Sequence, residues 1–558
     1  MATSTDGLRP ATDYYIRMEC VNFSAVFSDT EDLSTIRGSG LAMLHAIEYA
    51  ALVLEHLTGE AVEQVTTGAS VGVFRVRATD EADAWTVARN LRARLTAHAP
   101  AAANDEENEP ARPLSGAIDE AELIRVLDHL SILTAACAAT TDFRADMETL
   151  LTLIRWQQQQ APSLVLPGAG TSWDKTKLIC PNDHTRLADT YIFRRRDEGP
   201  GRYPASRSVR DRHAYGRHYK QTLYDRVIKG VRYLENDDGR FDRPAYADEL
   251  ADLARRPDKA LDGKMAVLYA DGNRFSEQIR DLVKASDTPI ETQKAIDKAL
   301  QAWRRDLLKT VVKLIAQDDP DYPLRRIETL LWGGDELIWV LPAWRGWEVA
   351  ALFAEHIRSV REPVDGWSMN MSHGLGMVFC HYDAPINGIR TLAEKLADDV
   401  AKAERERTRL AIMVLESFDA VGQDLEAHLT RTYETAGITP TAMCLTAPQE
   451  ASWNDVPGAV AAMKTHLPRR RLHALADALL HHGPVTQDQG SAKTETDRAW
   501  DRFWRDLDAP AEVAIREAAE TLGRCWGFDA QGTDARLWLH LDMLWDYLAP
   551  DVQDMAEV

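Results

Sequence analysis

The sequence predicts an α+β fold built around a ferredoxin-like domain. KMAVLYA (264–270) is a short apolar run bounded by a turn, which indicates a buried strand. RRIETLLW (325–332) and LIWVLPA (337–343) are strand-like and are joined by the tight turn GGDE, which predicts a hairpin. From about residue 416 onward, the pattern is mostly helical.

The remaining elements between 264 and 416 complete this domain. Helical patterns occupy about 274–285 and 289–316, between the first strand and the hairpin. After the hairpin, the pattern predicts a helix over WEVAALFAEHIRSV and a strand over HGLGMVFC (373–380). It then predicts a helix over GIRTLAEKLADDVAKAERER and a strand over LAIMVLE. The order β-α-(α)-β-β-α-β plus one addition is the split βαβ of the ferredoxin-like fold.

This topology predicts that three carboxylates converge. In a split βαβ, the first and second strands run parallel with the third between them. The end of the first strand therefore lies beside the turn that links the second and third strands. Asp271 directly follows the first strand, and Asp335 and Glu336 stand in that turn.

Converging carboxylates predict a site for a divalent metal and a nucleotide. They repel one another unless a cation is present, and a few hard oxygen ligands suit Mg²⁺ or Mn²⁺ that carries substrate phosphates. Gly333 and Gly334 would let the backbone approach those phosphates, and Lys402 is a candidate phosphate partner. The alternatives are a plain hairpin turn and, for Lys402, a solvated helix lysine.

Composition limits the classes of function. The 558 residues have room for three or four domains. With 65 basic and 87 acidic residues, net −22, the whole chain is a poor non-specific binder of nucleic acid. No apolar run nears the roughly 18 residues of a membrane span, no secretory signal is apparent, and the six cysteines are scattered. We expect a cytoplasmic protein with no membrane partner.

Other segments have weaker patterns. Residues 97–113 and 484–497 are small, polar and acidic, which predicts flexible segments. A basic stretch between 194 and 220 and the triplet 469–471 would either attract triphosphate or RNA or form a solvated surface paired with acids. The arginines concerned are Arg194, Arg195, Arg196, Arg202, Arg207, Arg210, Arg212, Arg217, Arg469, Arg470 and Arg471.

Several motifs resemble the large polymerase-like subunit of type III CRISPR effector complexes, whose catalytic palm is related to diguanylate cyclases. YADGNRF (269–275), LLWGGDELIWVLP (330–342) and MSHGLGMVFCHYDAPI (371–386) resemble the catalytic palm. IRMECVNFSAVFSDTEDLSTIRGSGLAML (16–44), with Arg37, Gly38 and Ser39 at the start of a helix, resembles the first, non-catalytic palm. MKTHLPRRRLHALADALL (463–480) resembles the helical C-terminal domain.

The resemblance implies four domains and a set of site residues. The domains are a first palm at 1–165, a connecting segment at 166–262, a second palm at 263–416 and a helical domain at 417–558. In the family, the second palm converts ATP into cyclic oligoadenylates for antiviral signalling. Carried over, the metal-binding catalytic residues are Asp271, Asp335 and Glu336, and the nucleotide-binding residues are Gly333, Gly334, Asn273, Ser372 and Lys402.

The chain departs from the family pattern at three places. The turn reads GGDE, whereas GGDD is usual, so the last acid is one methylene longer. An N-terminal nuclease domain is not expected, because the chain enters the first palm almost immediately. Of the four-cysteine zinc site between the palms, only Cys180 and His184 remain; we expect no zinc there, the alternative being a Cys-His₃ set with His213 and His218.

The first palm carries Thr67-Gly68-Ala69-Ser70 where the second carries the GGDE turn. No carboxylate stands in this tetrapeptide, so it cannot bind metal as the second palm would. We expect it to be a structural partner or a wall for a second nucleotide.

The function that these observations favour is a Mg²⁺- or Mn²⁺-dependent nucleotide cyclase or cyclic oligonucleotide synthase that uses ATP or another NTP. The alternatives are a non-enzymatic nucleotide-binding scaffold or RNA-sensing subunit, and a diguanylate cyclase. The expected partners are CRISPR effector subunits with guide and target RNA, or a second copy of the chain in a stand-alone relative.

Overall fold

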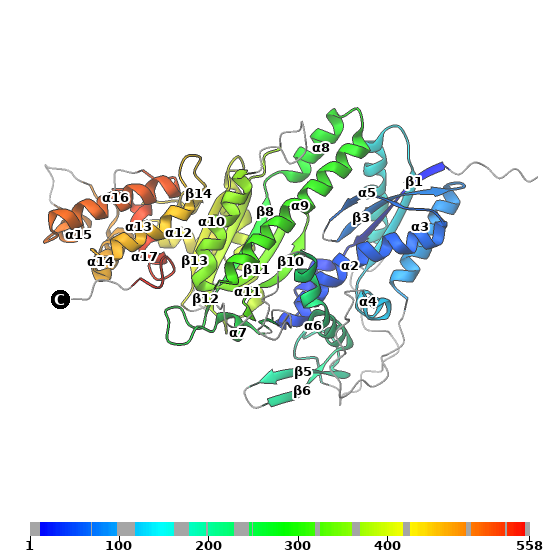
Figure 1. The fold of residues 1–558 in the computed structure, drawn as a ribbon, viewed down its shortest axis with the longest axis horizontal. Coiled ribbons are helices and arrows are strands. Elements are labelled where there is room, and N and C mark those ends of the chain that lie inside the picture. The colour runs from blue at the N-terminus through cyan, green and yellow to red at the C-terminus, as the bar shows by residue number, and fades with distance from the viewer. Residues whose placement is uncertain are drawn as a thin grey trace, which may run out of the picture.

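The fold is a row of domains in which two sheet-containing units are followed by a helical unit (Figure 1). It is known from a computed structural model, which describes residues 12–68, 70–97, 118–160, 178–196, 199–227, 245–247, 249–317, 324–359, 369–416, 424–486, 493–529 and 533–552. Most of the predicted flexible segment 97–113 and the middle of 484–497 lie outside the described residues.

The first domain is a four-stranded antiparallel sheet in the order β2-β3-β1-β4, covered by helices. This is the ferredoxin-like order, as the resemblance implied for the first palm. The strands are β1 (Thr12–Cys20), β2 (Glu63–Thr67), β3 (Val71–Ala78) and β4 (Ile132–Ala138). The helices are α1 (Phe23–Phe27), α2 (Leu33–Thr58), α3 (Glu81–Leu95), α4 (Glu120–Leu127) and α5 (Phe143–Gln160).

Helix α2 is the long central helix of the first domain. The Asp32 side chain accepts a hydrogen bond from the Thr35 backbone N at its start, and Gly59 ends it in the left-handed conformation, φ 71°. By length and composition alone α2 would suffice to cross a membrane, and 56% of its most apolar 18-residue window is buried within the protein. It is the only such helix in the part of the chain that the structure describes.

The connecting region supplies a hairpin and a helix that packs on α2. The elements are β5 (Thr190–Arg196), β6 (Gly199–Ala205), α6 (Arg207–Val227), β7 (Ala245–Tyr246) and α7 (Leu250–Ala254). Helices α2 and α6 cross at glycines. A Cβ on Gly38 would lie 1.9 Å from the Arg212 carbonyl oxygen, and a Cβ on Gly216 would lie 1.9 Å from the Ser34 carbonyl oxygen. Only glycine permits so close a crossing.

The second domain holds a mixed sheet in the order β10-β11-β8-β12-β13-β14. Its strands are β8 (Lys264–Gly272), β10 (Glu328–Gly333), β11 (Glu336–Pro342), β12 (His373–His381) and β13 (Arg409–Val414), with the short pieces β9 (Leu324–Arg325) and β14 (Leu445–Thr446). Helices α8 (Phe275–Ala285), α9 (Pro289–Ile315), α10 (Ala343–Ser359) and α11 (Ile386–Lys395) accompany it. The predicted split βαβ is confirmed.

The two faces of this sheet bury separate cores. Leu268 and Trp339 belong to a core that also contains residues of α9, α10 and the C-terminal helices. Val267 and Val340, at alternate positions, belong to the core beneath α11. Burial on both faces explains why KMAVLYA is apolar without alternation.

The C-terminal domain is helical, as predicted, and joins the second domain through tryptophans. It comprises α12 (Leu425–Tyr433), α13 (Val456–Lys464), α14 (Arg469–His482), α15 (Glu495–Trp504), α16 (Ala509–Trp526) and α17 (Ala535–Leu544). The Trp347 indole of α10 donates to the Trp453 carbonyl oxygen at 3.1 Å. Strand β14 pairs with β13, so the second sheet extends beyond the expected boundary at residue 416.

Candidate active site of the second domain

The site lies where β8 ends, between the β10–β11 hairpin and the start of β12. Strand β11 pairs Leu337 with Ala270, which places Glu336 beside Asp271. Strand β12 pairs Gly374 with Asp271 and His373 with Gly272. Asp271, Asp335 and Glu336 are thus brought to one edge of the sheet, as the topology predicted.

The hairpin turn consists of Gly334 and Asp335, because Gly333 pairs with Glu336 across it. Gly334 has φ +56°, a conformation that glycine adopts without strain. Among the described residues, no heavy atom lies within 4 Å of the position that a Cβ would take on Gly334. The described part of the protein therefore leaves this side of the backbone open, as the approach of a phosphate would require.

Gly272 allows the turn to lie against the end of β8. A Cβ on Gly272 would lie 2.8 Å from Asp335 Cβ and 2.5 Å from the Phe275 ring. These contacts are closer than any side chain permits, so the hairpin and α8 meet over a position without a side chain.

We predict that Gly272→Ala reduces ATP binding and turnover, because the added methyl group pushes the turn and Phe275 away from Asp271. The measurement is ATP affinity by calorimetry together with product formation. Gly458→Ala on α13 is the matched control, since a Cβ there meets nothing within 4 Å. Wild-type affinity in the Gly272→Ala variant would show that the close approach is not needed for binding.

Lys402 reaches the site through the glycines of β12. A Cβ on Gly374 would lie 2.6 Å from Lys402 Cγ, so the lysine stem crosses the strand where no side chain stands. The Lys402 ammonium forms an ion pair with Asp271 and a second one, 2.9 Å long, with Asp398. The predicted phosphate partner is therefore at the site, but its present partners are carboxylates.

The helix that carries Lys402 is not the regular helix that the sequence predicted over GIRTLAEKLADDVAKAERER. Helix α11 continues as a π-helical turn (Leu396–Val400) and a 3₁₀ turn (Ala401–Ala403). This segment packs closely on β12, since a Cβ on Gly376 would lie 1.9 Å from the Ala393 carbonyl oxygen. Such turns often mark functional sites.

Asp335 and Glu336 are partly buried carboxylates whose charge is not neutralised by an ion pair within the described residues. Burial, with the charge of Asp271 adding to it, raises the pKa of Asp335 to about 6. Burial also raises the pKa of Glu336 to about 7, against the hydrogen bond that the Tyr269 hydroxyl donates at 2.9 Å. In the part of the chain that the structure describes, no cation forms an ion pair with Asp335 or Glu336.

The donor set fits a divalent metal, although the side chains do not already form a cluster. Hard carboxylate oxygens with unbalanced charge are the ligands that Mg²⁺ and Mn²⁺ prefer. Across the described residues, no group of three or more Asp, Glu, His or Cys side chains stands ready to hold a metal ion. Asp271 faces Lys402, so binding a metal requires this carboxylate to turn or to serve both cations.

Asn273 and Ser372, predicted to line the nucleotide pocket, join the loops around the site. The Asn273 amide donates to Ser372 Oγ at 3.1 Å and to the Arg407 carbonyl oxygen at 3.3 Å. Asn273 is only 2% exposed. Ser372 lines a cavity of about 180 Å³ together with Arg358 and Arg407, and Asn273 does not line it.

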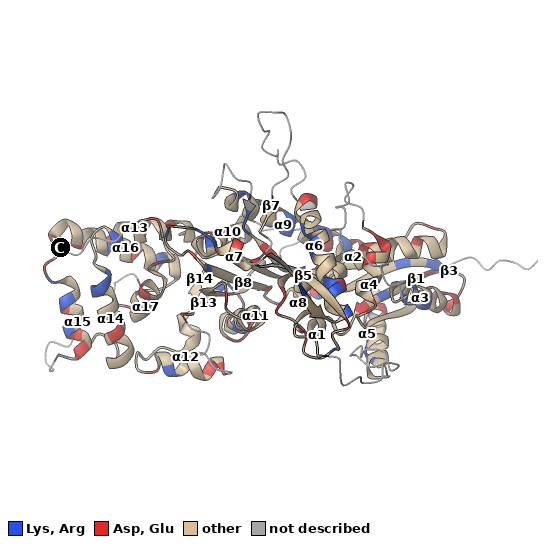
Figure 2. Cartoon of the chain, turned by 90° about the horizontal axis from the view of Figure 1, so that it is seen from below, with Lys and Arg blue, Asp and Glu red and all other residues tan. Residues whose placement is uncertain are grey.

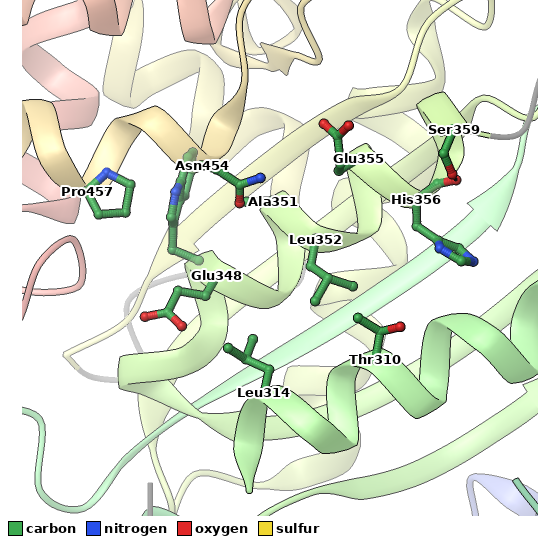
Figure 3. Close-up of a pocket in the computed structure, with 11 residues that line it drawn as sticks. Thr310, Leu314, Glu348, Ala351, Leu352, Glu355, His356, Ser359, Asn454 and Pro457 are labelled. Atoms are coloured by element: carbon green, nitrogen blue, oxygen red, sulfur yellow. Dashed lines mark hydrogen bonds between the residues drawn. The ribbon is translucent and has the colours of Figure 1, made fainter. Parts of the chain in front are cut away.

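A larger cavity of about 480 Å³ lies between α9, α10 and the start of the C-terminal domain (Figure 3). Leu314, Glu348, Glu355 and His356 are among the residues that line it. None of the predicted site residues lines this cavity. The volume of a cavity does not indicate which reaction it could support, whereas the carboxylates that converge at the sheet edge can bind a metal ion. The sheet edge is therefore the better candidate for the active site.

The turn of the first domain, Thr67-Gly68-Ala69-Ser70, holds no carboxylate. Within it Gly68 and Ser70 are described, whereas Ala69 lies outside the described residues. Thr67, at the end of β2, donates from Oγ1 to Asp297 on α9 at 3.0 Å. The end of this hairpin strand is therefore fastened to the second domain.

The histidines proposed to complete a zinc set have other partners. His213 Nδ1 lies 2.7 Å from Asp32, and His218 Nδ1 lies 2.8 Å from Glu122. Cys180 is buried among Ile192, Ala205 and Val209. The alternative Cys-His₃ set is not assembled, since no such metal cluster occurs among the described residues.

Several arginines of the basic stretch and the triplet are paired with acids or carbonyl groups. Fully buried Arg212 binds Asp29, Arg207 binds Asp189, and Arg210 binds Asp211. Arg469 binds Asp546, and Arg471 donates to the Phe503 carbonyl oxygen. Both basic and acidic residues lie along α14 and α15 (Figure 2). The described pairs support the solvated or structural interpretation. The side chains of Arg194, Arg195 and Arg196 lie outside the description.

The sequence interpretation missed Tyr269 and Asp398. Tyr269 stands two residues before Asp271 on β8, so strand periodicity places both on one face. Asp398 stands four residues before Lys402, the spacing of a helical ion pair. Both signals were present in the sequence.

The strand order and the hairpin turn at the sheet edge together define a palm-type domain. Residues 264–411 match the model of the Cas10/Cmr2 second palm domain. The match confirms the resemblance inferred from the motifs: the second domain is a palm of the Cas10/Cmr2 kind.

Solved structures resemble the whole chain weakly. An apo Csm1-Csm4 cassette matches with 11% identity and a TM-score of 0.48, covering 98% of this chain and 72% of that chain. A Csm1-Csm4 cassette in complex with cA4 matches with 12% identity and a TM-score of 0.46, covering 98% and 70%. At TM-scores below 0.5 these likenesses do not establish a shared fold. No curated protein matches this chain in sequence.

Proposed function

We propose that the second palm domain is a Mg²⁺- or Mn²⁺-dependent nucleotide cyclase or cyclic oligonucleotide synthase that uses ATP in type III CRISPR-like antiviral signalling. The observation that carries the proposal is the convergence of Asp271, Asp335 and Glu336 around a glycine turn, in a domain that matches the Cas10/Cmr2 second palm.

Asp271, Asp335 and Glu336 would hold the metal. When bound, the metal supplies charge neutralisation at the phosphates and lowers the pKa of an attacking 3′-hydroxyl. The open space beside Gly334 would receive the triphosphate. Lys402 would balance Asp271 before metal binds and would meet phosphate afterwards, because a cation in that place repels the incoming metal unless it turns away.

We predict that ATP binding depends on a divalent metal. The unbalanced carboxylates repel the triphosphate, and the repulsion disappears once Mg²⁺ or Mn²⁺ stands between them. Calorimetry with ATP in Mg²⁺, in Mn²⁺ and in EDTA measures the effect, and affinity should fall by at least about tenfold in EDTA, about 1.4 kcal/mol. Equal affinity in the three buffers would remove the metal from the proposal.

The test of activity is incubation with each of the four NTPs and Mg²⁺ or Mn²⁺, with products identified by mass spectrometry. Cyclic products from ATP support the proposal, and a cyclic dinucleotide from GTP would support the diguanylate cyclase alternative. No turnover of any NTP in the presence of candidate activating RNAs would contradict both.

The competing proposal is a scaffold that binds nucleotide or RNA without turnover. The Lys402–Asp271 ion pair favours it, because the pair neutralises one of the three expected metal ligands. Lys402→Ala distinguishes the two proposals. If Lys402 contacts phosphate in an active synthase, the substitution should reduce turnover. A scaffold shows no turnover in the wild type, and the substitution should leave that result unchanged.

Partners and location follow from the same proposal. In one arrangement, effector subunits with guide and target RNA would bind this chain in the cytoplasm and activate the synthase. In the other, the protein acts without an effector complex, and two copies of the chain would associate with each other. Size measurement with and without RNA distinguishes the two arrangements.

A further inference from the structure

Arg304, in the middle of α9, is a buried cation for which the described residues supply no ion-pair partner. The residue is only 6% exposed, and its Nε and Nη1 atoms have no hydrogen-bond partner in the described part of the chain. A guanidinium prefers to donate all of its N–H groups, and a buried, unpaired charge is costly. The arrangement indicates that an anion is needed here.

The surroundings of Arg304 direct it toward the hairpin turn. The guanidinium carbon lies 5.9 Å from the centre of the Trp332 ring, and Trp332 immediately precedes Gly333 and Gly334. The charged groups that act on Arg304 are Asp297 and Asp335, and neither forms an ion pair with it in the described parts of the chain. Arg304 therefore lies near the turn that carries the proposed metal ligands, and no ion pair within the described residues neutralises its charge.

The partners of Asp297 explain why it does not neutralise Arg304. Asp297 accepts hydrogen bonds from Thr67 Oγ1 at 3.0 Å and from the Gln301 amide at 2.8 Å. These bonds turn the carboxylate toward the end of β2 in the first domain. Asp297 is engaged by Thr67 and Gln301, and Asp335 is itself a proposed metal ligand, so both acids that act on Arg304 have other roles.

We propose that Arg304 binds the phosphate oxygens of the nucleotide at this site, on the side of the turn opposite Lys402. The ligand class is a polyphosphate anion, since a planar guanidinium presents paired N–H donors that match phosphoryl oxygens. The inference rests on the proposed function for the identity of that anion as a nucleotide. A role limited to stacking on Trp332 is the structural alternative.

The test uses the whole chain with Mg²⁺ present, so that the carboxylates do not repel the anion, and inorganic tripolyphosphate, ATP and adenosine serve as separate probes. Arg304→Gln should weaken binding of tripolyphosphate and ATP by about 10- to 100-fold, the loss of a hydrogen-bonded charge contact, and leave adenosine binding unchanged. Arg304→Lys should restore part of the affinity. The matched control is Arg305→Gln, the exposed neighbour on the same helix, which should bind all three probes as wild type does.

Melting temperature separates a binding role from a structural one. Removing a buried, unpaired charge should leave the melting temperature of Arg304→Gln unchanged or higher, whereas loss of an important stacking contact should lower it. Unaltered tripolyphosphate affinity in Arg304→Gln, or no tripolyphosphate binding by the wild type, would overturn the inference. If binding depends on Arg304 but no NTP is turned over, the anion site stands and the synthase proposal fails.

Discussion

Asp335→Asn is expected to abolish product formation from ATP while leaving the fold intact. Asp335 lies in the turn over Gly272, where its carboxylate is one of three proposed metal ligands. A metal supplies several kcal/mol of transition-state stabilisation, so loss of a ligand should reduce turnover by at least about 100-fold. The fold should survive, because the substitution removes one of several crowded charges and changes no volume.

The control for this experiment is Ser70→Ala in the corresponding turn of the first domain. No carboxylate stands there, so turnover should change far less. Product formation is followed by mass spectrometry, and the fold by melting temperature. If Asp335→Asn turns over ATP at the wild-type rate and its melting temperature is unchanged, Asp335 is not needed for catalysis. The second palm would then have a structural role only, and the scaffold proposal would be favoured.

Arg37→Met is expected to lower the free energy of unfolding by about 3 kcal/mol, because it removes a cation from a buried carboxylate that stays behind. Arg37 on α2 holds Glu328 on β10 with two hydrogen bonds of 2.6 Å, and Lys220 on α6 lies 3.0 Å from the same carboxylate. Burial raises the pKa of Glu328, but the charges of Arg37 and Lys220 outweigh burial and hold the pKa below its usual value.

The measurement is chemical and thermal unfolding of the variants. Arg37→Lys keeps the charge but loses the paired geometry, so it should show an intermediate loss. Arg498→Ala breaks an exposed pair with Glu495 and should cost at most about 0.5 kcal/mol. If Arg37→Met lowers the free energy of unfolding no more than Arg498→Ala does, the contact of Arg37 and Lys220 with Glu328 does not fasten the first domain to β10.

The contact between α2 and β10 gives a physical reason for Arg37-Gly38-Ser39, which the sequence marked only by resemblance. Gly38 admits the backbone of α6, and Gly40 faces the Leu330 carbonyl oxygen of β10, 2.8 Å from where a Cβ would stand. Arg37 can therefore reach Glu328. These are contacts across almost 300 residues of chain, and no local pattern encodes them.

The strand order and the approach of Asp271 to the GGDE turn could be predicted from the sequence, because hydrophobic periodicity and turn residues together indicate a split βαβ. The partners of the charged side chains could not be predicted in this way. Lys402 was assigned by its position on a helix, whereas its ion pair with Asp271 depends on glycines of β12 and a π-helical turn. Arg304 looks like any helix arginine in the sequence, since its burial depends on how α9 packs between the two domains.

The π-helical turn between α11 and Lys402 has a consequence for chain length. An α-helix advances about 100° per residue, and a π-helical turn accommodates one extra residue within an otherwise α-helical path. Deleting a single residue from Leu396–Val400 would let the segment relax into a regular helix and would leave Lys402 on the same face, because the π-helical turn already absorbs that residue. Deleting a residue from the regular turns of α11 would instead rotate the segment that follows by about 100°. Lys402 would then lose its position over Gly374, and Asp271 would lose its cation without any change in composition at the site. The length of α11 therefore acts as part of the site, whereas the π-helical turn is a place where the chain can shorten by one residue and keep the lysine.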